Sequence, residues 1–207
     1  MLHFAAVETS TLGLLKKLMS IDEFDGLRLV GGTALALQFG HRKSIDLDLF
    51  GKQTHETIEL TNILNKVGDV QVIKDSPAIK IYSLNGIKVD FVNYPYAWSN
   101  DIISEEKLRL AHPEDIGAMK LAAITGRGSK KNFVDLYFLL KKYSLKELIS
   151  FYQNKYHDGS VFLALKSLTY FEDADQDEDL NMLIETQWAQ IKETILRVHG
   201  EYMSNLT

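Results

Sequence analysis

The chain has 207 residues, of which 45% are hydrophobic and 25% are charged, a balance typical of a soluble globular protein with a core of its own. It contains no cysteine, which excludes disulfides and thiolate metal sites and favours the reducing cytoplasm as its compartment. The net charge of −5 excludes a dominantly basic, histone-like protein, and no apolar run approaches the ~20 residues of a membrane span, so we expect no membrane partner.

The first part of the chain mixes helices and strands. No basic, cleavable leader opens it, so we expect no signal peptide, and residues 8–19 have the apolar spacing of an amphipathic helix. The pattern then predicts a strand over 27–32 that enters a glycine turn, a helix over 33–40 that ends at Gly40, a strictly alternating strand over 44–50, and a helix over 55–68 that ends at Gly68.

The clearest local signal is a hairpin over residues 78–92. Asn85-Gly86 separates two β-rich runs, which specifies a two-residue type I′ turn. From residue 112 onward the pattern is nearly all helical, with Asp or Ser at the helix starts and an amphipathic helix near the end. We therefore expect an α/β core over residues 1–110 and a helical subdomain over 111–207.

Two aspartates stand on the alternating strand. Successive side chains of a strand point to opposite faces, so Asp46 and Asp48 share one face, with α-carbons roughly 6.6–7 Å apart. Parallel carboxylates repel each other unless a cation lies between them, and Mg²⁺ takes carboxylate oxygens together with substrate phosphates. The alternative is the solvated face of an edge strand. The position just after a Gly-Gly turn favours a functional pair, because Asp is a poor strand residue.

The hairpin offers a third acid. With Asn85-Gly86 as its loop, Leu84 pairs with Ile87 and Ile81 lies opposite Asp90, which places this acid on a mostly apolar face. An acid there needs a neutralising partner. Two interpretations stay open: a metal ion shared with the other two acids, or a salt bridge to Lys88, two residues away on the same face.

The glycine turn and the basic residues after it suit phosphate. Gly31 and Gly32 allow close backbone approach at the start of a helix, whose free N–H groups attract anions. Thr33 has two candidate roles, as the helix N-cap or as a hydroxyl that binds phosphate, and we expect capping. Arg42 has the planar guanidinium that matches phosphate oxygens.

Three segments together resemble one known family. The runs "GGTALALQFGHRKSIDLDLF", "VDF" and "KLAAITGRGSKKNFVDLYFLL", in this order, resemble the AbiEii-type nucleotidyltransferases of the DNA polymerase β-like superfamily, which include toxins of bacterial toxin–antitoxin and abortive-infection systems. The resemblance covers roughly residues 27 to 145. It implies a nucleotidyltransferase core, a small mixed sheet with packed helices, followed by a helical C-terminal part.

The resemblance also implies roles for single residues. Asp46 and Asp48 hold Mg²⁺, and Asp90 is the third acid, which also helps to activate the attacking hydroxyl. The nucleotide-binding residues that it implies, together with Arg42 from the argument above, are Gly31, Gly32, Thr33, Lys120 and Asp135.

The residues around Lys120 and Asp135 support these roles in part. Lys120 lies in an apolar run, which favours a function over a plain surface position. Asp135 also lies in an apolar helix, where an unpaired acid is costly, so it needs a partner: Lys120, Arg127 or a ligand. Lys131 lies four residues before Asp135 and offers a local ion pair.

The leading hypothesis is a Mg²⁺-dependent transfer of a nucleoside monophosphate from an NTP to an acceptor hydroxyl. Residues 101–150 carry nine Lys or Arg against seven Asp or Glu, which favours RNA, in particular tRNA, as the acceptor. A cognate antitoxin is a candidate partner. The alternatives are a small-molecule acceptor, or a non-catalytic module that only binds a nucleotide. The acidic segment 172–179 lacks the glycine of a calcium-binding EF-hand loop and predicts a solvated loop.

Overall fold

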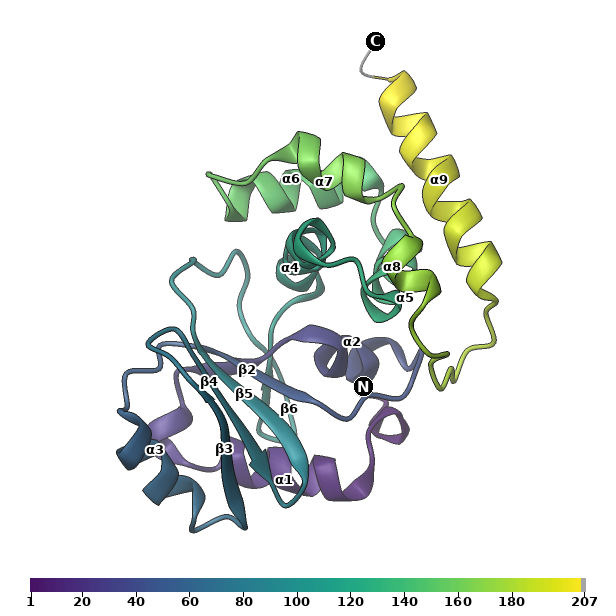
Figure 1. Cartoon of the computed structure of the whole chain (residues 1–207). Coiled ribbons are helices and arrows are strands. Elements are labelled where there is room, and N and C mark those ends of the chain that lie inside the picture. The colour runs from purple at the N-terminus through teal and green to yellow at the C-terminus, as the bar shows by residue number, and fades with distance from the viewer. Residues whose placement is uncertain (206–207) are drawn as a thin grey trace. The chain divides into compact units, whose positions relative to one another are not determined.

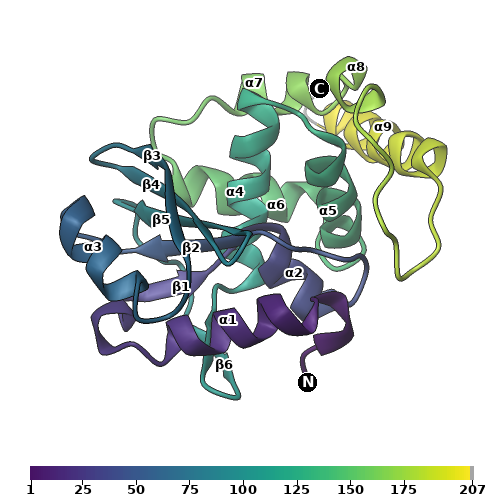
Figure 2. The same ribbon diagram turned by 60° about the horizontal axis from the view of Figure 1, so that its bottom comes forward.

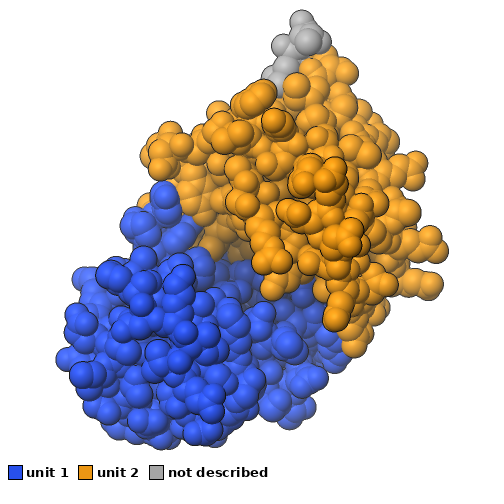
Figure 3. All heavy atoms as spheres, in the orientation of Figure 1, with its two compact units in different colours: residues 1–96, 101–111 blue, residues 97–100, 112–207 orange. Residues whose placement is uncertain are grey.

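The computed structural model describes residues 1–205, which divide into two compact units (Figure 3). The sheet unit contains residues 1–96 and 101–111, and the helical unit contains residues 97–100 and those from 112 onward. Within residues 1–205 no helix combines the length and the apolar character that crossing a membrane requires.

The sheet unit begins with helices and ends with strands (Figures 1 and 2). Its elements are η1 (Phe4–Ala6), α1 (Thr9–Met19), η2 (Asp22–Phe24), β1 (Leu27–Leu29), α2 (Gly31–Phe39), β2 (Leu47–Gly51), α3 (Thr57–Leu64), β3 (Val70–Asp75), β4 (Ile79–Leu84), β5 (Ile87–Asn93), β6 (Ile103–Glu105) and β7 (Leu108–Leu110).

The strands form one seven-stranded sheet in the order β3-β4-β5-β2-β1-β7-β6. β2 runs parallel to β5 and β1 runs parallel to β7, whereas the other neighbours are antiparallel. The sheet is therefore mixed, as predicted. This order places β2 directly beside the second strand of the predicted hairpin.

One face of the sheet forms the core of the unit. Side chains alternate along each strand, and those on this face are almost completely buried. They are Leu27 and Leu29 of β1, Leu47 and Leu49 of β2, Tyr82 and Leu84 of β4, Val89 and Phe91 of β5, and Leu108 and Leu110 of β7. The residues between them, among which are Asp48 and Asp90, are partly exposed on the other face.

The predicted hairpin is confirmed in its register. Leu84 pairs with Ile87 and Ile81 pairs with Asp90. Asn85 and Gly86 have φ angles of 52° and 82°, the positive values that a type I′ turn requires at both central residues. Local turn chemistry was therefore sufficient to place Asp90 on its strand.

The strand that was expected over 44–50 begins later, at Leu47. Ser44 instead forms an isolated bridge with Val7, and the backbone carbonyl of Asp46 accepts a hydrogen bond from the hydroxyl of Thr33. Because this segment bonds to the N-terminal part and to α2, it does not join the sheet. Ile45, in this segment, is 59% exposed.

The ends of two predicted helices give opposite outcomes. Gly40 ends α2 with a φ of 64°, as expected, and its N–H donates to the carbonyl of Ala36. The helix expected to reach Gly68 stops at Leu64 instead. Gly68 packs against the side chain of Asn85, which also accepts a hydrogen bond of 2.8 Å from the backbone N–H of Asp69, so the chain leaves the helix to meet the hairpin turn.

The helical unit is built almost entirely of helices, as predicted. They are α4 (Pro113–Gly126), α5 (Lys130–Leu140), α6 (Leu145–Lys155), α7 (Val161–Ser167), α8 (Glu172–Asp175) and α9 (Trp188–Ser204). Ser144 and Ser160 cap α6 and α7 through their hydroxyl groups. Ile191 and Ile195 are the buried residues of α9, which contacts α5 and α6.

The acidic segment 172–179 is more than a solvated loop. The carboxylate of Asp177 accepts a 2.8 Å hydrogen bond from the first backbone N–H of α5, on Lys130. Asp179 pairs with the Nζ of Lys130 at 3.1 Å, and Asp175 accepts hydrogen bonds from Trp188 and Lys192. Most of this segment is exposed, as expected, but Glu172–Asp175 form the short helix α8, and the acids contact the start of α5 and the start of α9.

A buried ion pair holds residues 97–100 in the helical unit. The Nζ of Lys155 lies 2.6 Å from Oδ1 of Asp115, and both side chains are completely buried. Lys155 also donates to the carbonyl of Ala97, and Asp115 accepts from the backbone N–H groups of Ser99 and Asn100. The pair thus attaches this short segment to α4 and α6.

Candidate active site

Two predicted acids lie side by side on neighbouring strands. The parallel pairing of β2 with β5 makes Asp48 and Asp90 direct partners in register, which places both side chains on the same face of the sheet. Neighbouring strands lie about 4.8 Å apart, so the two carboxylates are close enough to share a cation. Asp46 lies two residues before Asp48, outside the strand, and is half-buried.

The glycine turn gives Asp48 its space. Gly31 is the first residue of α2 and has a φ of 68°, in the left-handed region that favours glycine. A Cβ added there would collide with Oδ2 of Asp48 and lie 3.1 Å from its Cγ. The backbone N–H of Val30 also donates a 2.9 Å hydrogen bond to the carbonyl of Asp48. The turn and the acid therefore fit together only because residue 31 has no side chain.

Thr33 is not the N-cap that we expected, because that position is taken by Val30. Thr33 lies in the first turn of α2, where its buried hydroxyl donates to the backbone carbonyl of Asp46 and contacts Oγ of Ser44 at 2.8 Å. It thereby ties the start of α2 to the segment that carries the acids. Gly32 follows Gly31 in the same turn of the helix.

Lys88 lies among the acids. Its Nζ is 2.6 Å from Oδ1 of Asp90, and the two side chains are 42% and 17% exposed. Burial by itself would lower the pKa of Lys88, but the hydrogen bond to Asp90 and the charges of Asp90, Asp48 and Asp46 outweigh it and raise the pKa. The salt bridge that was left open as an alternative is therefore present, and all three carboxylates act on one ammonium group.

The acids have the chemistry of a divalent-metal site, although Lys88 supplies the positive charge there. Within residues 1–205 no three His, Cys, Asp or Glu side chains are grouped so that they could hold a metal ion together. The donors are nonetheless hard carboxylate oxygens, and the missing Cβ of Gly31 leaves one of them room. The ammonium of Lys88 neutralises part of the charge that a divalent cation would neutralise. Metal binding by Asp46, Asp48 and Asp90 stays a prediction.

Arg42 is placed differently from what a phosphate ligand on the surface would need. Its side chain is only 4% exposed, and Nη1 donates a 3.0 Å hydrogen bond to the carbonyl of Lys43. His41, its neighbour, is completely buried. A nucleotide-binding role for Arg42 stays a prediction.

In the helical unit, Asp135 has found the partner that its apolar helix requires. The Nζ of Lys120 lies 2.7 Å from Oδ2 of Asp135, with the two side chains 8% and 0% exposed. Lys120 also donates to Oδ1 of Asn132 at 3.2 Å. Because Asp135 is fully buried, it acts on any ligand only through the lysine that it holds.

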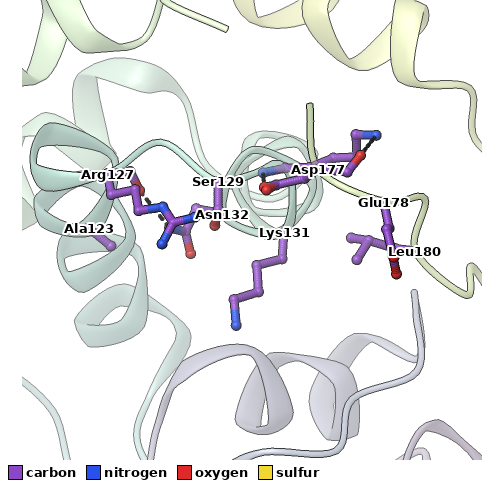
Figure 4. A pocket seen from close by; sticks show the side chains of 9 residues that line it. Ala123, Arg127, Ser129, Lys131, Asn132, Asp177, Glu178 and Leu180 are labelled. Carbon is purple, nitrogen blue, oxygen red and sulfur yellow. Dashed lines mark hydrogen bonds between the residues drawn. The ribbon is translucent and has the colours of Figure 1, made fainter. Parts of the chain in front are cut away.

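A cavity of about 630 Å³ lies in the helical unit where α4 ends and α5 begins (Figure 4). Arg127, Ser129, Lys131 and Asn132 line it from these two helices and their connection. Figure 4 shows Arg127 beside Asn132, whose side chain donates to the Arg127 carbonyl at 3.3 Å, and Lys131 extending away from α5. Asp177 and Glu178 complete the wall, so the cavity joins basic and acidic groups.

The sequence matches, over residues 13–202, the family described as "Nucleotidyl transferase AbiEii toxin, Type IV TA system". This chain belongs to the AbiEii nucleotidyltransferase toxin family. An uncharacterized protein of Aquifex aeolicus is 35% identical over 199 residues, which are 92% of this chain and 95% of that protein. Membership of the AbiEii family makes the chain a nucleotidyltransferase and implies a nucleotide substrate and an antitoxin.

Two solved structures share the fold of this AbiEii protein. The nucleotidyltransferase toxin MenT4 of Mycobacterium tuberculosis superposes with a TM-score of 0.63 at 14% identity, covering 93% of this chain and 82% of MenT4. JHP933 of Helicobacter pylori gives a TM-score of 0.52 at 18% identity, covering 96% of each chain. At these identities the likeness establishes the fold, which agrees with the mixed sheet and helical part expected from the sequence.

Sequence reasoning missed two contributors to the acid site of this AbiEii protein. The contact of Gly31 with Asp48 depends on how β1 and β2 pair, which no local pattern specifies. Ser44 contacts Thr33, and one sequence feature could have indicated it. Ser44 precedes Asp46 by two residues, so the two share a face of the expected strand. Lys88 was noted only as a neutralising neighbour of Asp90.

Proposed function

We propose that this AbiEii protein transfers a nucleoside monophosphate from an NTP to a hydroxyl group of an RNA acceptor, in particular tRNA, with Mg²⁺ as its cofactor. The observation that carries the proposal is the in-register placement of Asp48 beside Asp90, with a glycine turn against Asp48. The acids would hold Mg²⁺, which supplies charge stabilisation for the attacking and leaving oxygens when bound.

Residues of this chain accept the proton of the acceptor hydroxyl and bind the triphosphate. Asp90 accepts the proton of the acceptor hydroxyl as its oxygen bonds to the α-phosphorus, the bond to the pyrophosphate oxygen breaks, and pyrophosphate leaves. Gly31, Gly32 and Thr33 form the first turn of α2, whose N-terminus suits triphosphate oxygens. Such catalysis consists mostly of positioning and charge stabilisation.

Basic side chains offset the charge of the phosphates. Lys120, held in place by Asp135, is assigned to the nucleotide, and Arg42 is a second candidate once its side chain leaves the Lys43 carbonyl. Arg127 and Lys131 line the cavity of the helical unit and suit a phosphate of the acceptor backbone. The basic residues Arg127 and Lys131 of this mixed lining favour RNA over an uncharged small molecule.

The test is NTP-dependent labelling of an acceptor. Purified protein is incubated with α-labelled NTPs and either total tRNA or a panel of small metabolites. We expect labelling of tRNA and its loss in Asp46→Ala and Asp48→Ala, because each variant removes a carboxylate from the site. Asp69→Asn, which changes an exposed acid at the far end of the same unit, is the matched control and should label like the wild type.

Three results would change the proposal. Wild-type labelling by both aspartate variants would end it. Labelling confined to a metabolite would replace RNA with a small-molecule acceptor, and nucleotide binding with no transfer to any acceptor would favour a non-catalytic module. We propose a cytoplasmic location because NTPs and tRNA are present there. Growth inhibition relieved by an antitoxin would support the role as a toxin.

A further inference from the structure

Lys88 and Asp90 form an ion pair on a central strand of the sheet. They lie two residues apart on the same face of β5, and Nζ is 2.6 Å from Oδ1. The pair lies beside Asp48, the in-register partner of Asp90 on β2. A lysine ammonium therefore holds the carboxylate of one of the acids that the proposed function assigns to a divalent cation.

The ammonium group lies among the acids of the site. Asp90 holds it by a hydrogen bond of 2.6 Å, and Asp48 is the in-register partner of Asp90 on the neighbouring strand. Three carboxylates on one small area repel each other, and this single positive charge reduces that repulsion. In the protein without a metal ion, Lys88 thus reduces the repulsion between the carboxylates, as a bound metal ion would.

Lys88 is also free to move. Its side chain is 42% exposed, so its ammonium, on a flexible four-carbon stem, can turn into solvent when another cation takes its place beside Asp90. Lys155 and Lys120, whose side chains are 0% and 8% exposed in their own ion pairs, lack this freedom. Compared with these two buried pairs, the pair in the acid site is the one that can open.

We propose that Lys88 is an exchangeable internal cation, which neutralises Asp46, Asp48 and Asp90 until a divalent cation binds and then moves off Asp90. The inference rests on the proposed function, because that function supplies the reason for a metal at these acids. It adds that Lys88 competes with the metal and so weakens its binding. If the open arrangement is populated about one tenth of the time or less, removal of the lysine tightens metal binding about tenfold or more.

The experiment measures binding of Mn²⁺ alone, by electron paramagnetic resonance, to the full chain without nucleotide. We expect Lys88→Gln to bind Mn²⁺ at least about tenfold more tightly than the wild type. Lys74→Gln is the matched control, since it removes one positive charge from an exposed position on β3 and leaves the acids untouched. It should bind like the wild type. Thermal unfolding checks that each variant is folded.

A second measurement follows the lysine itself. In protein labelled with ¹⁵N-lysine, the ammonium signal that is absent from Lys88→Gln belongs to Lys88. We expect this signal to change on addition of Mg²⁺, as its hydrogen bond to Asp90 is lost, while the signal of Lys155 stays constant. Combining Lys88→Gln with Asp90→Asn should abolish the tighter Mn²⁺ binding, which locates it at this acid.

The outcomes separate this inference from the proposed function. Equal or weaker Mn²⁺ binding by Lys88→Gln, or equal tightening in Lys74→Gln, overturns the exchange. No Mn²⁺ binding by any variant overturns it as well. In each case the proposed transfer still stands if Asp46→Ala and Asp48→Ala lose tRNA labelling. Conversely, tighter Mn²⁺ binding with no labelling of any acceptor keeps the exchange and removes the transfer.

Discussion

Two lysine–aspartate pairs of the helical unit differ from the pair in the acid site of the sheet unit. In the helical unit, Lys155–Asp115 and Lys120–Asp135 are almost completely enclosed, and each carboxylate is held by its lysine in a fixed place. In the sheet unit, the Lys88–Asp90 pair is partly open to solvent. Exposed pairs contribute little to stability, whereas removing one partner of a buried pair is costly. Burial thus separates two ion pairs that hold the helical unit together from a pair in the acid site that can change partners.

The largest expected effect comes from breaking the most buried pair. Asp115→Asn leaves the ammonium of Lys155 enclosed without a counter-charge, so we expect the free energy of unfolding to fall by about 3–5 kcal/mol. Urea denaturation measures it. Adding Lys155→Met to this variant removes the stranded charge and should recover part of the loss. A decrease below about 1 kcal/mol would show that this pair behaves like an exposed one.

In the sheet unit, the position of Asp48 depends on the absence of a side chain at residue 31. Gly31→Ala introduces a Cβ against Asp48 at a residue with a φ of 68°, so we expect a loss of about 1–3 kcal/mol in the free energy of unfolding. Because Asp48 must shift, nucleotidyl transfer should fall about 100-fold, well beyond the change in stability.

Gly13→Ala is the matched control for this variant. Gly13 lies within α1, where an added Cβ would meet no atom within 4 Å, so the change should stabilise the protein by about 0.5–1 kcal/mol and leave transfer unchanged. Wild-type transfer by Gly31→Ala would contradict the idea that Asp48 needs the space beside residue 31.

The smallest expected effect concerns Tyr143, whose ionised form is disfavoured by burial and by nearby carboxylates. Burial, then the charges of Glu114 and Glu147, raise the pKa of Tyr143 from 10.0 to about 12. Above pH 10 the unfolded chain ionises this phenol before the folded protein does, so its contribution to stability is present below pH 10 and is lost as the pH rises toward 12.

Tyr143→Phe cannot ionise and tests this difference. Between pH 8 and pH 11 the melting temperature of the wild type should fall slightly more than that of the variant. The exposed part of the side chain keeps the effect small. Equal decreases would show that the folded protein does not disfavour ionised Tyr143.

The sequence predicted what local chemistry controls. Asn85-Gly86 specified the hairpin register and thereby the position of Asp90, and the apolar surroundings of Asp135 correctly required a partner such as Lys120. It did not specify that β2 pairs with β5, because pairing between strands so far apart in the chain depends on the assembled sheet. The catalytic roles of the acids stay predictions.

The predictions that differ from the structure also fail because of contacts between residues far apart in the sequence. Thr33 looked like an N-cap because it follows two glycines, yet its hydroxyl bonds to a carbonyl 13 residues away. Asp177 looked solvated within an acidic run, yet it caps a helix that begins 47 residues earlier. In both cases a polar side chain hydrogen-bonds to a backbone group far away in the sequence, and the periodic pattern of the sequence does not predict such a contact.

The contact of residues 97–100 with Lys155 constrains the order in which parts of the chain fold during synthesis on the ribosome. Lys155, which donates to the carbonyl of Ala97, is synthesised 58 residues after it. The strands that follow this segment can join the sheet while α6 is still inside the exit tunnel. If the nascent chain were released at that stage, the strands would be complete, but residues 97–100 would lack their contact with Lys155. That contact forms only after Lys155 has been synthesised.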